Sequence, residues 1–143
     1  MPLLTPFVLG ALACMVNFGM LLFNLGFTRA SEIAALNPEV FSVFGQAMIL
    51  VWGVAFLLAG FCDGNRPSHI WWAFTLEKFM YVSSYVLFLK DNPALKFDLS
   101  SLEFVAPLFH YIYGPIDFIF MVLFAQQGLA ASRVRHDQEL KSA

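Results

Sequence analysis

The chain contains four long apolar runs, and these constrain the fold more than any other feature of the sequence. A helix of about 20 apolar residues crosses the hydrocarbon core of a bilayer, which is about 30 Å thick. Because backbone polar groups in lipid must bond within the chain, such runs form helices. The sequence therefore predicts an all-α, polytopic membrane protein with a four-transmembrane-helix up-down bundle in a single domain, residues 1–131, and a polar tail, residues 132–143. The predicted spans are residues 5–27, 39–62, 70–89 and 102–131.

The composition agrees with this fold class. Of the 143 residues, 59% are hydrophobic and 13% are charged, and the mean hydropathy is +0.72, outside the usual range of soluble domains. A net charge of -2 and a pI near 5.8 leave no basic surface, so nucleic acid is not predicted as a partner. The lipid bilayer is the predicted partner, and the sequence leaves open a larger membrane complex or a homo-oligomer.

The first run is predicted to be a span rather than a signal peptide. Residues 1–6 contain no Lys or Arg, whereas a signal peptide carries positive charge before its apolar core. Small and polar side chains recur along this run at steps of three and four and therefore share one face. We expect that face to point inward, where amides hydrogen-bond to neighbouring helices, with ligand contact as the alternative. Its residues are Gly10, Cys14, Asn17, Leu21 and Asn24.

The third run carries two adjacent charges of opposite sign, Glu77 and Lys78. A charged group at bilayer depth costs about 2.5–3.5 kcal/mol on insertion scales, so it persists only where it faces a partner or a water-filled cavity. Successive helical residues point about 100° apart, so we expect Glu77 and Lys78 not to pair with each other. At least one of them needs a partner from another helix.

The fourth run offers such a partner in Asp117, which follows a kink predicted at Gly114-Pro115. Consecutive helices of an up-down bundle are antiparallel neighbours. Counted from the loop that joins the last two runs, Lys78 and Asp117 lie at similar depth, which predicts an ion pair between them. The groups left to match Glu77 are Asn17, Tyr81, His110, water or its own proton.

These side chains define a candidate polar centre with two interpretations. In the first, the charges fix the register of the helices, and the protein is an accessory or interaction subunit. In the second, they line a pocket for a quinone-like or lipid-like molecule, a proton or another small solute. No cofactor is predicted, although the second interpretation admits a quinone or a lipid. The candidate residues are Asn17, Glu77, Lys78, Tyr81, His110, Tyr113 and Asp117.

Other chemistries have no motif in the sequence. No carboxylate and histidine residues have the spacing of metal ligands, so no metal site is predicted. A haem between helices needs two histidines at matched depth, but His69 and His110 fall towards opposite ends of their runs. A P-loop, a dinucleotide-binding fingerprint and a nucleophile elbow are also missing from the sequence. We therefore assign no catalytic residues and do not expect an enzyme.

With four spans, an acidic residue in the third (Trp72 to Glu77-Lys78) and Gly114-x-x-Asp117-x-x-Phe120 in the fourth, the chain resembles the small four-helix bacterial membrane proteins grouped as DoxX-like. The resemblance is one of architecture over most of the chain and transfers no functional residue. It implies a bacterial inner membrane and a connection with quinol-oxidising or sulfur-oxidising complexes. Lys and Arg in the connecting segments and the C-terminal tail number four against three in favour of cytoplasmic N- and C-termini, the orientation that we assign.

Overall fold

The computed structural model describes residues 2–62, 68–92 and 104–142, and this part of the chain is helical throughout apart from its turns. The first predicted run forms α1 and the short α2, and two further short helices precede the long α5. The helices are α1 (Pro6–Phe18), α2 (Met20–Phe23), α3 (Ala30–Leu36), α4 (Pro38–Phe41), α5 (Val43–Phe61), α6 (Ser68–Asp91) and α7 (Val105–Ser142).

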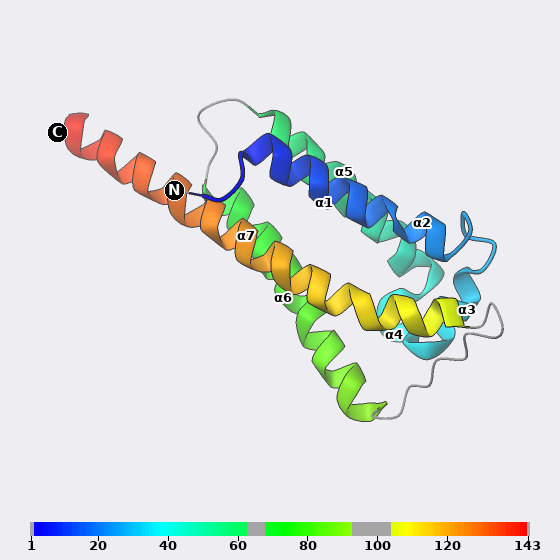
Figure 1. The fold of residues 1–143 in the computed structure, drawn as a ribbon. Helices are drawn as coiled ribbons and strands as arrows, with labels where there is room; N and C mark the ends of the chain where they lie inside the picture. The colour runs from blue at the N-terminus through cyan, green and yellow to red at the C-terminus, as the bar shows by residue number, and fades with distance from the viewer. Residues whose placement is uncertain (1, 63–67, 93–103, 143) are drawn as a thin grey trace.

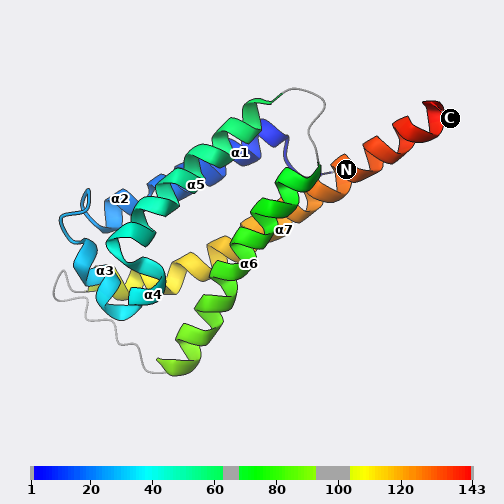
Figure 2. The same cartoon turned by 180° about the vertical axis from the view of Figure 1, so that it is seen from behind.

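The long helices pack as two antiparallel pairs, α1 with α5 and α6 with α7. Figures 1 and 2 show that α1, α5, α6 and α7 run in alternating directions, and that α3 and α4 lie at the end of the molecule where α7 begins. At the opposite end, Gln127 of α7 donates a hydrogen bond to the carbonyl of Leu4, just before α1. The start of α1 is thus fixed beside the second half of α7.

Three helical segments are long and apolar enough to cross a membrane: Pro6–Phe23, Val43–Phe61 and Val105–Lys141. The prediction of apolar spanning helices is therefore confirmed for three of the four runs. The third run also forms a helix of sufficient length, the 24-residue α6. It is not among these three because the charges at Glu77 and Lys78 and the hydroxyls of its second half lower its hydropathy.

Several helix ends differ from the predicted ones, and local capping explains them. The first run stops being helical after Phe23, because Asn24 accepts a hydrogen bond from the Phe27 amide and residues 25–27 have positive φ. The second run becomes a long helix only at Val43, where the Ser42 hydroxyl accepts a hydrogen bond from the Gly45 amide.

The C-terminal segment, predicted as a polar tail, is helical. Residues 132–142 continue α7 as one helix, in which Arg135 pairs with Glu139 one turn further on. Pro115 lies inside this helix without ending it. Figure 1 shows the C-terminal turns of α7 projecting beyond the other helices.

Aromatic side chains form much of the core between the two helix pairs. Phe56 of α5 lies within 5.0 Å of the rings of Phe74 on α6 and Phe124 on α7, measured between centroids. Trp71, near the start of α6, is 1% exposed and stacks on Phe124. Its burial against α7 fixes one end of the contact between α6 and α7.

Gly10 permits the close approach of α1 and α5, and Gly10→Ala tests it. A Cβ at this position would collide with the Phe56 carbonyl oxygen and lie 3.2 Å from the Gly60 Cα. Both atoms belong to backbone, so no side chain can yield. We expect a loss of about 1–3 kcal/mol in the free energy of unfolding, measured by denaturant titration in detergent. Met15→Ala on the exposed side of α1 is the control, and equal stability of both variants would contradict this packing.

Candidate functional site

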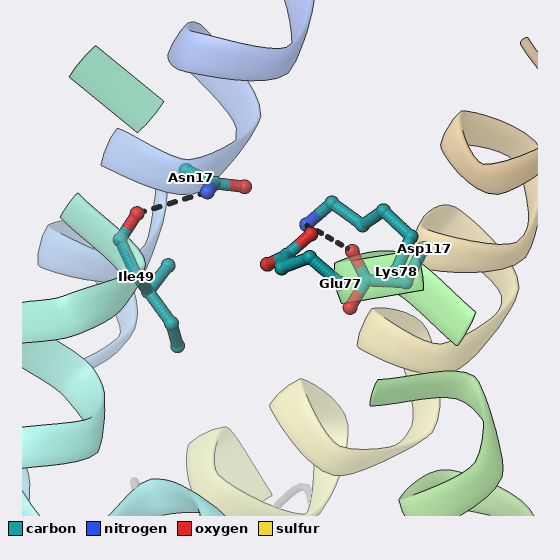
Figure 3. A network of polar contacts seen from close by, with 5 residues as sticks. All are labelled: Asn17, Ile49, Glu77, Lys78 and Asp117. Carbon is teal, nitrogen blue, oxygen red and sulfur yellow. Dashed lines mark hydrogen bonds and ion pairs between the residues drawn. The ribbon is translucent and has the colours of Figure 1, made fainter. Parts of the chain in front are cut away.

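The Lys78 ammonium of α6 and the Asp117 carboxylate of α7 form a buried ion pair. Nζ of Lys78 lies 2.7 Å from Oδ1 of Asp117, and the two residues are 3% and 9% exposed. Figure 3 shows the pair between the two helices. This distance confirms the predicted ion pair. The prediction holds because antiparallel neighbours place residues that are equally distant from their connection at the same height.

Glu77 lies on the other side of the same ammonium. Its Oε2 is 3.6 Å from Nζ of Lys78, so the expectation that these neighbours do not pair was wrong. The four-carbon stem of lysine is long enough to bring its ammonium back towards the preceding residue, which the 100° rotation argument ignored. However, 3.6 Å is too long for a hydrogen bond, and this oxygen has no hydrogen-bond partner among the described residues.

Glu77, Lys78 and Asp117 form what we call the charged cluster. It holds two carboxylates and one ammonium, and it carries one excess negative charge when all three groups are ionised. Aromatic rings provide further stabilisation for the ammonium. Nζ of Lys78 lies 5.1 Å from the ring centroid of Phe56 and 5.5 Å from that of Tyr81, both within the range of cation–π attraction. Phe56 was not a candidate from the sequence, because one phenylalanine among seventeen gives no signal of such a role.

Asn17 joins α1 to α5 beside this cluster. Its Nδ2 donates a hydrogen bond to the carbonyl oxygen of Ile49 at 2.9 Å, which confirms the expected interhelical bond. In Figure 3 the oxygen end of the amide points towards the charged groups of α6 and α7. The second expected amide, Asn24, also bonds between helices, because its Nδ2 donates to Oε1 of Gln46 at 2.9 Å.

A small cavity of about 70 Å³ lies beside the ion pair. Its volume suits a few water molecules rather than an organic ligand. Five of the seven candidate residues line it: Asn17, Lys78, Tyr81, Tyr113 and Asp117. The structure thus brings these five side chains together from α1, α6 and α7.

A larger depression lies between α4, α5 and α6, and we call it the α5–α6 groove. Its volume is about 580 Å³. Glu77 lines this groove but not the cavity, Lys78 and Asp117 line the cavity but not the groove, and Tyr81 lines both. The charged cluster therefore separates two spaces of different size. The groove residues are Glu39, Val40, Trp52, Ala73, Leu76, Glu77, Met80, Tyr81 and Ser84.

His110 does not join the other candidates. Its side chain is fully buried, Nδ1 lies 2.8 Å from the carbonyl oxygen of Ala106, and the ring packs against Phe41 and Phe88. It lines neither the cavity nor the groove. His110 is thus placed as a core residue two turns from Asp117, and the structure gives it no contact with Glu77. Within the described ranges, no group of three His, Cys, Asp or Glu side chains is placed to hold a metal ion.

These features define the class of the protein as an all-helical chain with three helices fit to cross a membrane and a buried charge cluster between two helix pairs. No family model matches the chain, and no curated protein or solved structure is significantly similar to it. The resemblance to DoxX-like proteins stays a prediction.

Proposed function

We propose that the chain is an integral membrane protein with four spans, in which α6 crosses the membrane in addition to the three helical segments identified above. Three structural observations on α6 support this proposal. The helix is long enough, it runs antiparallel beside α7, and the charges that lower its hydropathy are buried against other helices rather than exposed to lipid. The DoxX-like resemblance supports a bacterial inner membrane, and the distribution of Lys and Arg supports cytoplasmic N- and C-termini.

We infer that the α5–α6 groove binds a lipophilic small molecule, quinone-like or lipid-like, whose polar group reaches Glu77. The observation that carries this function is the 92% buried Glu77, whose Oε2 lacks a hydrogen-bond partner in the described part of the chain and whose side chain lines the groove. The groove volume lies in the range of ligand sites, and most of its lining is apolar. A buried carboxylate in the wall of a mostly apolar groove is an arrangement that orients an amphiphile.

Binding is testable with decyl-ubiquinone, a neutral lipophilic probe. Because Trp52 lines the groove, we expect saturable quenching of tryptophan fluorescence in the detergent-purified protein. Ala73→Phe fills the groove without touching the ion pair, so it should weaken binding at least tenfold. Val51→Phe, on the exposed side of α5, is the matched control and should bind as the wild type does. Quenching that does not saturate, or that Ala73→Phe leaves unchanged, would refute the groove as a site.

Glu77→Gln separates ligand binding from folding. The substitution removes the excess negative charge and leaves Lys78 paired with Asp117 at 2.7 Å. We therefore expect thermal unfolding in detergent at an equal or higher temperature than the wild type. A large loss of stability would show that the Glu77 carboxylate holds the helices together, as the structural interpretation of the polar centre requires.

An accessory subunit of a larger complex is the second candidate function, and the C-terminal end of α7 favours it. This end projects beyond the bundle (Figure 1) and exposes Val134 and Leu140 among charged residues. If it binds a partner subunit, extraction in mild detergent should yield a complex larger than the monomer. Truncation after Ser132 should then release the monomer, and a wild type that is already monomeric in the native membrane extract would contradict this role.

A further inference from the structure

The charges around the α5–α6 groove have one sign. Two carboxylates line it, Glu39 and Glu77, and none of the described residues in its lining is Lys, Arg or His. The ammonium of the charged cluster, that of Lys78, lines the small cavity instead and lies 2.7 Å from Asp117. A ligand in the groove therefore contacts the Glu77 carboxylate, whereas the Lys78 ammonium, 3.6 Å from Oε2 of Glu77, lines the cavity.

Aromatic rings line the same groove. Trp52 and Tyr81 are both part of it, and the faces of such rings attract cations. The orientation of Trp52 is fixed by packing, because its ring stacks on Phe56 at 6.2 Å and meets Phe74 edge-on at 6.3 Å. Tyr81 lies one turn from Glu77 on α6, so a carboxylate and a ring are presented side by side.

The apolar part of the lining defines the rest of the ligand. Leu76 and Met80 are 60% and 66% exposed on the outer side of α6, next to the carboxylate. If α6 spans the membrane as proposed, these side chains face acyl chains, and a small, fully hydrated ligand would not enter such an apolar setting. A molecule with a charged head and bulky apolar groups would cover them while its head lies at Glu77.

We propose that the α5–α6 groove binds lipophilic organic cations, whose charge is balanced by Glu77 and whose apolar groups lie along Leu76 and Met80. This inference rests on the proposed function of the groove as a ligand site and names the class of its ligand. Glu77, Asp117 and Lys78 together carry one excess negative charge when all three are ionised. A monovalent cation at Glu77 balances this charge, so the ligand and the charged cluster together become neutral.

Tetraphenylphosphonium and tetraphenylborate provide a matched test, since they have nearly the same size and apolar surface but opposite charge. We expect the wild-type protein in neutral detergent to bind the phosphonium at least tenfold more tightly than the borate, measured by equilibrium dialysis. Glu77→Gln should remove most of this preference, and Glu39→Gln, at the exposed edge of the groove, should reduce it less. Ala73→Phe should weaken phosphonium binding, whereas Val51→Phe should leave it unchanged.

The outcomes separate this inference from the function on which it rests. Equal affinity for the two ions, or a preference that survives Glu77→Gln, would overturn the cation proposal while saturable decyl-ubiquinone binding still supported the groove as a site. Phosphonium binding that Ala73→Phe does not weaken would also overturn it, because the ion would then bind elsewhere. Failure of the wild type to bind either the quinone or the phosphonium would overturn both.

Discussion

Replacing Lys78 by methionine should lower the free energy of unfolding by about 3–5 kcal/mol, the cost typical of breaking a buried ion pair on one side. The ammonium is the only positive group of the charged cluster, and it lies 2.7 Å from Asp117 and 3.6 Å from Glu77. Its removal leaves two carboxylates without a counter-charge among helices α5, α6 and α7. Reversible unfolding in mixed micelles, followed by circular dichroism, would measure the loss.

Variants of Asp117 provide the control, because they leave a different number of unbalanced charges. Asp117→Asn keeps one ammonium opposite one carboxylate, that of Glu77, so it should destabilise the protein less than Lys78→Met does. The double variant Lys78→Met/Asp117→Leu should recover much of the single-variant loss, since an apolar pair is often as stable as a buried ion pair. A double variant no more stable than Lys78→Met would show that the two groups do not interact in the folded protein.

The ion pair could be predicted from the sequence because it depends on few quantities. Two charges in consecutive apolar runs, an antiparallel connection and a fixed rise per residue are sufficient to place Lys78 and Asp117 at one height. The interhelical bond of Asn17 was predictable for a similar reason, since an amide in an apolar run must find a partner within the protein. In both cases the cost of burying a polar group restricts the arrangements that remain.

The α5–α6 groove could not be predicted in this way. Its shape depends on the separate helix α4, which places Glu39 near α6, and on the ring orientation of Trp52. Glu39 reads in the sequence as the first residue of a membrane span, because the break at Ser42 results from a local hydrogen bond rather than from a strong breaker. The position of His110 was missed for another reason. Its Nδ1 lies 2.8 Å from the carbonyl oxygen of Ala106 in its own helix, and its ring packs against Phe41 and Phe88 rather than lining the cavity or the groove.

Gln46 is the residue whose structural role the sequence least indicated. We expect Gln46→Met to lower the free energy of unfolding, by less than Lys78→Met does. The side chain is fully buried, and its Nε2 donates to the carbonyl oxygens of Ala30 at 2.7 Å and Phe41 at 2.8 Å. Its Oε1 accepts a hydrogen bond from Nδ2 of Asn24. One amide thus joins the end of α2, the start of α3, and α4 to α5.

Methionine has nearly the same volume as glutamine but can neither donate to the two carbonyls nor accept from Asn24 as an amide oxygen does. A buried polar group without a partner costs about 1–3 kcal/mol, so losing both carbonyl contacts should destabilise the protein by about 2 kcal/mol or more. Because the bonds converge where α3 and α4 meet α5, limited proteolysis should cut residues 25–42 faster in the variant than in the wild type. Gln138→Met, on the exposed end of α7, should change neither quantity. Unchanged proteolysis together with unchanged stability in Gln46→Met would mean that the short helices are held in place by apolar contacts, such as those of Ile33 and Phe41, and not by this amide.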